Sequence, residues 1–299
     1  MTLEILPTGE ALGAEVRGVD LSAPVDDATM AALRDAWTEH LVLLFRGQSL
    51  NDPELLDAAR IFGELQIGGN RAFMQRGRRE DSNLMSLHPE ITIISNLDED
   101  GRPTQSNTGL GSDEVVWHSD NSYIELPPAG SMLYAIELPV DRGGDTSFNN
   151  QYLAYATLPA DLKAAIEGKS QRHDSSRNSA GVLRPSAMLP ATPEEVEGPV
   201  HPLVRLHPAT GQKALYLGRR RVWPSNYIVG LSNEDSEALL DRLWDHATQP
   251  EFAWTHRWRV GDVLLWDNRC AMHYRSEVDP TQARVLHRTQ IAGETVLAG

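Results

Sequence analysis

The sequence has a single cysteine, no long apolar run and no basic leader pattern. The one cysteine, Cys270, excludes an internal disulfide framework and fits a reducing compartment. No stretch is long and apolar enough to span a bilayer, and residues 1–4 lack the basic start and apolar run of a signal peptide. We therefore expect a cytoplasmic protein with no membrane contact.

Basic residues are also scarce. The chain carries 27 lysines and arginines against 42 aspartates and glutamates, a net charge of −15. This balance disfavours a nucleic-acid partner, because phosphates are met by basic tracks. With 40% hydrophobic and 23% charged residues, the 299-residue chain has the composition of one large globular domain. No Ser/Gly-rich linker or internal repeat divides it, so we expect a single domain over residues 1–299.

The apolar pattern predicts many strands and few helices. Periodicity near 3.6 residues predicts helices at residues 27–40, 53–62 and 233–247. Short apolar or alternating runs predict strands at residues 41–45, 91–97, 131–138, 203–206, 213–217, 255–260, 263–266 and 284–291. The expected fold class is mainly β with flanking helices.

Two long segments, 68–90 and 172–200, show no clear element. The first is rich in Gly, Arg and Asn, and the second in Ser, Pro and Glu. Loops of this length are usually lids, binding loops or disorder. A lid would keep water from a reactive site, whereas a tolerated surface insertion would have no such role. The sequence favours neither, and we carry both segments forward as candidate lids.

The most informative motif is Trp117-His118-Ser119-Asp120, read together with the distant His273. On an extended segment, residues i and i+2 point the same way, so His118 and Asp120 can reach one metal ion. Two imidazoles and one carboxylate hold a non-haem Fe(II) on one face and leave the opposite face free for oxygen and substrates. A His-x-Asp pair alone is a weak signal, and the alternative is a polar pair at a strand edge.

Two arginines support the metal site. Arg284 and Arg288 follow His273 and share one face of the strand predicted at residues 284–291. Burying two guanidiniums is costly unless anions meet them, and the planar fork of arginine suits a carboxylate. An iron centre followed by a carboxylate-binding arginine is what a 2-oxoglutarate-dependent oxygenase needs. For Arg284 alone, a surface salt bridge is the alternative.

In these motifs the chain resembles the taurine/dichlorophenoxyacetate dioxygenase family (TauD/TfdA), whose members depend on Fe(II) and 2-oxoglutarate (α-ketoglutarate). The resemblance rests on the order and spacing of segments that cover nearly the whole chain. The matching segments are LGAEVRGVDL at 12–21, WHSD at 117–120, PPA at 127–129, GGDT at 143–146, HPLVRLHP at 201–208, WDNR at 266–269 with His273, and residues 284–288. It implies a double-stranded β-helix, the cupin-like jelly roll.

The resemblance also assigns roles to residues. It implies that His118, Asp120 and His273 bind the iron and so form the catalytic centre. Thr146 and Arg284 match the positions that hold the distal carboxylate of 2-oxoglutarate. The implied cofactors are Fe(II), 2-oxoglutarate as co-substrate, and O2. The implied reaction hydroxylates a small organic substrate and releases succinate and CO2.

The primary substrate is expected to be a small anion. Arg288 matches a family position that contacts an anionic group on the substrate. Val115 stands in the stretch where taurine-specific members carry an asparagine, and an arginine run follows Gly218. These departures favour aryloxyalkanoate-type members, cleavage of an ether, and aromatic or xenobiotic catabolism. The expected substrate contacts are Arg288, His88, Val115, Tyr123, Arg220 and Trp223, and we expect a homo-oligomer.

Other functions remain open at this point. One is a dioxygenase for taurine or another alkyl sulfonate or sulfate ester. Another is a catalytically silent metal-binding jelly-roll module, which would not need Thr146 and Arg284. An iron halogenase would lack the carboxylate ligand, present here as Asp120. His201 and His207 could form a second metal pair, but we expect no nearby carboxylate to complete a site, so we expect them to make structural hydrogen bonds.

Overall fold

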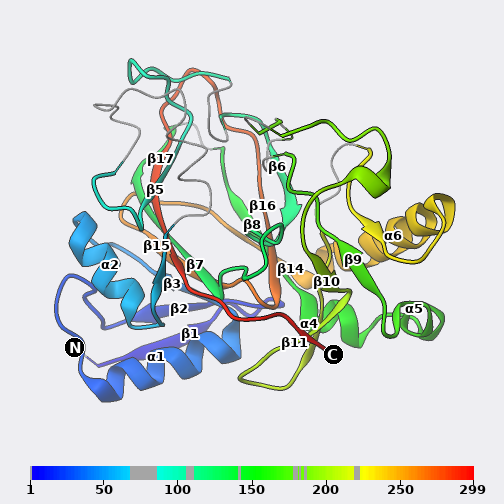
Figure 1. The fold of residues 1–299 in the computed structure, drawn as a ribbon. Helices are drawn as coiled ribbons and strands as arrows, with labels where there is room; N and C mark the ends of the chain where they lie inside the picture. Colours follow the sequence, from blue (N-terminus) through cyan, green and yellow to red (C-terminus); the bar gives the residue numbers. More distant parts are fainter. Residues whose placement is uncertain are drawn as a thin grey trace.

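The computed structural model consists mainly of strands, with helices on the outside (Figure 1). It describes residues 2–67, 86–105, 111–140, 143–177, 181, 183–184, 187–218 and 223–299. The predicted class, mainly β with flanking helices, is confirmed. None of the helices in these ranges is long and apolar enough to cross a membrane.

The larger sheet has eight strands, antiparallel except where β2 runs parallel to β3. Its order is β1 (Glu4–Pro7), β2 (Ala14–Arg17), β3 (Val42–Phe45), β15 (Val263–Asp267), β7 (Gly130–Glu137), β17 (Val285–Ile291) and β4 (Leu65–Gln66), and β5 (Thr92–Ser95) also pairs with β17. This sheet includes the strand predicted to carry the arginines.

The second sheet has four antiparallel strands and faces the first. Its order is β14 (Ala253–His256), β8 (Thr146–Asn150), β16 (Ala271–Arg275) and β6 (Val115–His118). Two three-stranded sheets complete the described β-structure: β10 (Val200–Pro202), β9 (Ser170–Arg172) and β13 (Tyr227–Ile228), and β12 (Lys213–Leu215), β11 (Val204–Leu206) and β18 (Leu297–Ala298).

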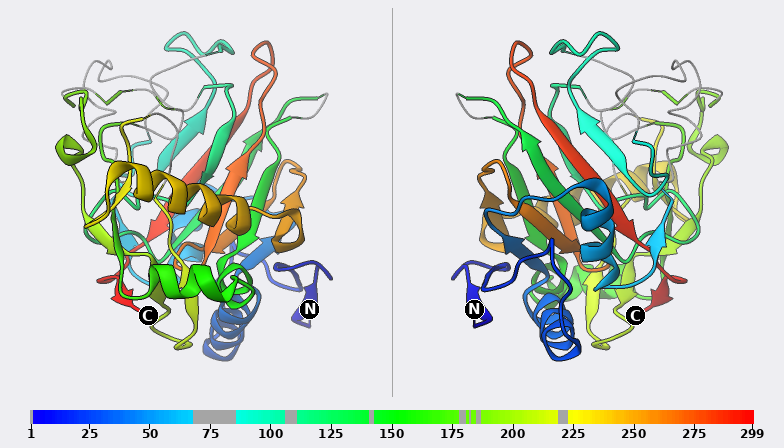
Figure 2. Two further views of the ribbon diagram at one scale, coloured as in Figure 1. Left: turned by 90° about the vertical axis from the view of Figure 1, so that its right-hand side faces the viewer. Right: turned by 90° about the vertical axis from the view of Figure 1, so that its left-hand side faces the viewer.

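The helices cover the outer faces (Figure 2). Helices α1 (Asp27–His40) and α2 (Asp52–Arg60) pack on the eight-stranded sheet, and the side chains of Asp26 and Asn51 cap their N-termini. On the opposite side lie α4 (Gln151–Ala156), α5 (Ala160–Ile166) and α6 (Asn233–Ala247). Two short 3-10 turns, Pro193–Glu195 and Pro250–Phe252, complete the described helical structure.

A core of apolar side chains lies between the two main sheets. Leu264 and Trp266 of β15 point into it, while the alternate residues Val263 and Leu265 pack under α1 and α2. On β17, Leu286 points into the same core. Because side chains alternate along a strand, the other even-numbered residues of β17 also face the space between the sheets.

The predicted boundaries hold best where apolar residues dominate. Helices 27–40 and 233–247 have the predicted bounds, but the strand predicted at 255–260 lies at Ala253–His256. There Ala253 to His256 pair with β8, and a turn held by the bond from the Arg259 amide to the Asp262 carboxylate (2.8 Å) follows. Strands β6, β8 and β16 were not predicted as such, although they carry much of the site.

Candidate active site

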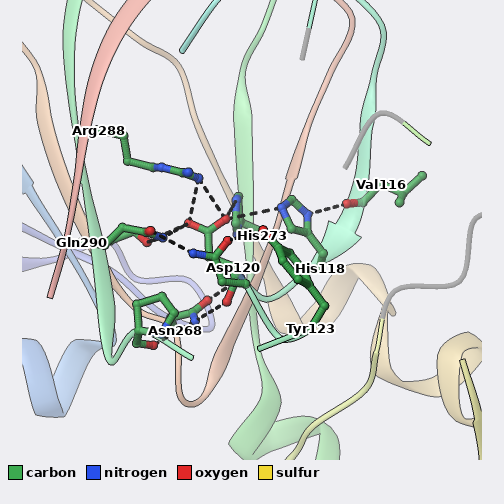
Figure 3. A network of polar contacts seen from close by, with 11 residues as sticks. Val116, His118, Asp120, Tyr123, Asn268, His273, Arg288 and Gln290 are labelled. Atoms are coloured by element: carbon green, nitrogen blue, oxygen red, sulfur yellow. Dashed lines mark hydrogen bonds and ion pairs between the residues drawn. The ribbon is translucent and has the colours of Figure 1, made fainter. Parts of the chain in front are cut away.

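The three residues predicted as metal ligands converge between the two sheets (Figure 3). Oδ1 of Asp120 lies 3.7 Å from Nε2 of His118 and 3.8 Å from Nε2 of His273. The two imidazole centroids are 4.1 Å apart, and one ligand atom from each residue lies within 4.8 Å of the others. All three side chains are buried. Two imidazole nitrogens and one carboxylate oxygen therefore face a common point, as a facial iron site requires.

Strand pairing positions the two histidines, whereas a turn positions the aspartate. His118 ends β6 and lies directly across from His273 of β16. Asp120 lies beyond the end of β6, so the expectation that it shares an extended segment with His118 is wrong. Asn268 holds it instead: Oδ1 of Asn268 accepts from the Asp120 amide (2.6 Å), and Nδ2 donates to the Asp120 carbonyl (2.9 Å).

Hydrogen bonds fix the orientation of the Asp120 carboxylate. Its Oδ2 accepts from the hydroxyl of Ser131 (2.7 Å) and from Nε2 of Gln290 (3.2 Å). Nη1 of Arg288 lies 3.2 Å from both carboxylate oxygens. Oδ1 is thus left facing the two imidazoles, as Figure 3 shows. Bonds of this kind behind a metal-binding carboxylate set its orientation.

The electrostatics favour the protonation states that bind a metal. Burial and repulsion from His118 lower the pKa of His273 to about 3, so its imidazole is neutral at pH 7. Burial opposes the charge on Asp120, but Arg288, His118 and His273 hold the pKa of this carboxyl well below its usual range. A neutral imidazole beside a carboxylate is the ligand state that metal binding requires. The donor set therefore fits Fe(II).

The two residues predicted to hold 2-oxoglutarate are also buried between the sheets. Thr146 begins β8, and its Oγ1 accepts from Nε1 of Trp258 (3.0 Å). Arg284 precedes β17 and donates from Nη2 to the carbonyl of Gly144 (2.9 Å). Burial, reinforced by repulsion from Arg275, lowers the pKa of Arg284. A guanidinium whose charge is disfavoured in this way gains stability when a carboxylate arrives.

Gly144 leaves the room that Arg284 occupies. Its backbone has φ of +70°, and a Cβ at this position would overlap Nε of Arg284 and lie 2.7 Å from its Cδ. Glycine is therefore required both by the left-handed backbone and by the close approach of the arginine. The GGDT motif thus includes a residue that positions the neighbouring guanidinium.

The expected substrate contacts lie in several places. Tyr123 is buried and donates to Oδ1 of Asn121 (2.9 Å), close to Asp120 in Figure 3. Val115 is buried on β6. The segment of His88 is tied to α2 through Ser86, and Trp223 is 57% exposed. Arg220 lies outside the described residues.

Three residues that sequence reasoning did not select belong to this region. Asn268 and Gln290 position Asp120. Arg275 of β16 lies directly across from Thr146 of β8. Asn268 belongs to the WDNR segment, and Gln290 shares the face of Arg288, so both carried a usable signal. Arg275 stands two residues after His273 and therefore points to the same side of β16.

His207 belongs to a second buried cluster. Its Nε2 lies 3.0 Å from Oδ2 of Asp267, and Cys270 lies within 4.8 Å. A carboxylate does therefore meet His207, contrary to the expectation from sequence. Arg269 already binds both oxygens of Asp267, at 2.9 and 2.6 Å, and burial raises the pKa of the Cys270 thiol. The expected structural role of His207 fits this network better than a metal site.

The family follows from comparison with known proteins. The family model described as "Taurine catabolism dioxygenase TauD, TfdA family" matches residues 4–290. The chain belongs to this family. It is similar to "(S)-phenoxypropionate/alpha-ketoglutarate-dioxygenase" of Delftia acidovorans, with 33% identity over 310 residues, covering 100% of this chain and 98% of the relative. It is also similar to the "Alpha-ketoglutarate-dependent sulfate ester dioxygenase" of Pseudomonas putida, with 31% identity over 304 residues, covering 98% and 91%.

A solved structure agrees with the sequence relatives. AAD-2 in complex with Mn(II) and N-oxalylglycine matches with a TM-score of 0.80 and 29% identity, covering 100% of both chains. Together with the His-Asp-His geometry, these likenesses make this TauD/TfdA member a 2-oxoglutarate-dependent non-haem iron dioxygenase. Its cofactors are Fe(II), 2-oxoglutarate and O2, as the sequence predicted.

Proposed function

We propose that His118, Asp120 and His273 bind the iron of this dioxygenase. The observation that carries the proposal is the position of Oδ1 of Asp120, 3.7 and 3.8 Å from the two Nε2 atoms, with Oδ2 already taken by Ser131 and Gln290. When bound, the iron supplies oxygen activation coupled to oxidative decarboxylation of 2-oxoglutarate to succinate and CO2. The protein contributes ligands, orientation and exclusion of water.

We propose that Arg284 and Thr146 hold the far carboxylate of 2-oxoglutarate. Both are at most 2% exposed, and Nε of Arg284 has no hydrogen-bond partner among the described residues. An arginine fork and a hydroxyl together offer the planar, charge-assisted contacts that a carboxylate accepts. This contact fixes which end of the keto acid points towards the ligand triad.

We propose that Arg288 orients the anionic group of the primary substrate. Its guanidinium lies beside Asp120, and its buried Nε has no hydrogen-bond partner within the described part of the chain. A carboxylate placed there would lie next to the iron ligands, and its carbon chain would be held where oxidation occurs. Tyr123, Val115, Trp223, His88 and Arg220 remain predicted substrate contacts.

An aryloxyalkanoate is the favoured substrate. The supporting observation is the likeness to the phenoxypropionate dioxygenase, which covers the whole chain. Hydroxylation of the carbon next to an ether oxygen gives a hemiacetal, which breaks down to a phenol and a carbonyl compound. A sulfate ester is the second candidate, supported by the likeness to the sulfate ester dioxygenase. Either anion could be met by the Arg288 guanidinium.

Several broader features stay predictions. We propose that the two main sheets form the double-stranded β-helix of the family within a single domain, residues 1–299. Segments 68–90 and 172–200 are proposed as lids, although much of the first lies outside the described residues. A cytoplasmic location fits the single, buried Cys270. The homo-oligomeric state is likewise a prediction, which sedimentation of the purified protein would test.

Oxygen consumption with a panel of anions tests the proposed substrate. The iron-loaded enzyme with 2-oxoglutarate should consume oxygen fastest with aryloxyalkanoic acids, and should release the phenol in equal amount. Sulfate esters and alkyl sulfonates form the other arms of the panel. A rate with a sulfate ester that exceeds every aryloxyalkanoate would reject the favoured class in favour of the second candidate.

A further inference from the structure

Arg275 is a buried arginine beside the proposed 2-oxoglutarate site. It follows the iron ligand His273 by two residues on β16 and lies directly across from Thr146 on β8. Cross-strand partners share a face, so Arg275, Thr146 and His273 all point into the space between the sheets. Arg275 is 6% exposed and Arg284 is 2% exposed.

Neither of these two guanidiniums has a carboxylate within 4.0 Å in the part of the chain that the structure describes. Arg275 donates from Nη1 to the carbonyl of Gly111 (3.1 Å) and from Nη2 to that of Asp113. Arg284 donates to the carbonyl of Gly144. The Nε of each arginine is buried and has no hydrogen-bond partner there. The hydrogen-bond partners of both guanidiniums in the described residues are therefore uncharged backbone carbonyls.

Binding of an anion would stabilise these two buried guanidiniums. Buried charges are normally paired, and two like charges near each other destabilise the fold until a counter-charge arrives. The acidic groups that act on the pair are Asp113 for Arg275 and Asp145 for Arg284, and both side chains are partly exposed. A dicarboxylate that enters between the sheets would supply the missing charge at this place.

We propose that Arg275 is a second arginine for the far carboxylate of 2-oxoglutarate, acting with Arg284 and Thr146. The proposal rests on the 2-oxoglutarate site proposed above and deepens it. Arg284 and Thr146 provide direct contacts, and Arg275 adds charge and a further N–H donor from the sheet that carries Thr146. The site would then select a keto acid with a carboxylate at its far end against one that ends in a methyl group.

A purely structural role is the competing explanation. Through the carbonyls of Gly111 and Asp113, Arg275 holds the segment that leads into β6 and His118. A structural role would affect every ligand of the site alike. A role in recognition would affect only ligands that carry the far carboxylate. Two keto acids that differ in this group therefore separate the two roles.

Anaerobic calorimetry of the Fe(II)-loaded protein provides the test. 2-Oxoglutarate and 2-oxopentanoate share the keto-acid end, but only the first has the far carboxylate. The Kd of 2-oxopentanoate divided by the Kd of 2-oxoglutarate measures the preference for that group. We expect Arg275→Gln to reduce this ratio about tenfold or more, by weakening 2-oxoglutarate and sparing 2-oxopentanoate. Arg275→Lys, which keeps the charge without the fork, should reduce it less.

Controls make each outcome decisive. Arg242→Gln, at an exposed arginine paired with Asp161 on α5, should leave the ratio unchanged. An unchanged ratio in Arg275→Gln overturns the inference, and Arg275→Lys decides in the same way if the glutamine variant does not fold. If Arg284→Gln lowers the ratio and both Arg275 variants keep it, the inference alone fails. If the native protein shows no preference for 2-oxoglutarate, the proposed co-substrate site fails as well.

Discussion

At the scale of single residues, the site depends on the different partners of the two Asp120 carboxylate oxygens. One oxygen of Asp120 faces the imidazoles, and the other is held by Ser131 and Gln290. The meeting of His118, Asp120 and His273 could be predicted from the sequence, because the motif and the lone His273 supply a complete donor set for the proposed iron site. The sequence marks Asn268, through the WDNR segment, and Gln290, through the face that it shares with Arg288. Their contacts with Asp120 become visible only in the structure, because they depend on the pairing of distant strands.

Replacing Asp120 with Ala should remove iron and activity together. Two imidazoles alone bind Fe(II) weakly, and Arg288 loses the carboxylate that it contacts. We expect iron content after dialysis to fall by at least about tenfold and succinate formation to be undetectable. Metal analysis beside Asp161→Ala, at an exposed aspartate, provides the comparison. Normal iron content with retained turnover in Asp120→Ala would show that the triad is misassigned.

The two arginines near the triad should separate kinetically. Loss of a charge-assisted contact costs about 1.5–3 kcal/mol, or roughly one to two powers of ten in affinity. Arg284→Ala should raise the KM for 2-oxoglutarate by that factor with every substrate. Arg288→Ala should leave slow, substrate-independent decarboxylation largely intact and uncouple it from substrate oxidation. Equal weakening of 2-oxoglutarate by both substitutions would contradict this division.

At the scale of elements, the strands that carry the site were the hardest to predict. Strand β8 reads TSFNN and β16 reads AMHYR, so polar side chains occupy positions that face the interior. Apolar alternation is therefore broken in the strands where function needs polar groups. Helices α1 and α6 bury apolar side chains at helical spacing and were predicted with their bounds. The register between strands is set by tertiary packing and is not visible in a local pattern.

The turn before β8 offers a sharp test, because Gly144 makes room for Arg284. Gly144→Ala places a Cβ 2.7 Å from Cδ of Arg284 and should raise the KM for 2-oxoglutarate by about tenfold. Gly211→Ala is the matched control, since Gly211 has nearly the same φ, +69°, and a Cβ there would meet nothing within 4 Å. Both variants carry the backbone strain of about 1–2 kcal/mol, but only the first displaces the arginine. Equal KM values in the two variants would contradict the role of Gly144.

At the scale of the whole molecule, a buried ion network links the eight-stranded sheet to the three-stranded sheet that contains β11. Asp267 lies at the end of β15, binds Arg269 with both oxygens and meets His207 next to β11. Burial alone would raise the pKa of Asp267, but Arg269 and His207 together hold it below its usual range. Asp267 therefore adds stability above the pKa of about 3.9 that it has in the unfolded chain, and this contribution falls as pH drops below that value.

Asp267→Asn should lower the free energy of unfolding by about 3–5 kcal/mol at pH 7, because Arg269 would lose its buried partner and keep only the exposed Glu294, 4.0 Å away. Between pH 5 and pH 3 the native protein should lose about 1 kcal/mol more than the variant, since only the native protein has this carboxyl to protonate. Urea unfolding at several pH values measures both effects. If the free energy of unfolding falls equally with pH in the two proteins, Asp267 does not contribute in this way.

The central claim concerns the reaction of the molecule as a whole, and succinate release tests it most directly. Purified protein with Fe(II), ascorbate, oxygen and 2-oxoglutarate should form succinate, and an aryloxyalkanoic acid should raise the rate by about tenfold or more. Chelation of the iron should abolish both rates, and readdition of Fe(II) should restore them. Failure of the folded, iron-loaded protein to form succinate with any member of the anion panel would contradict the account.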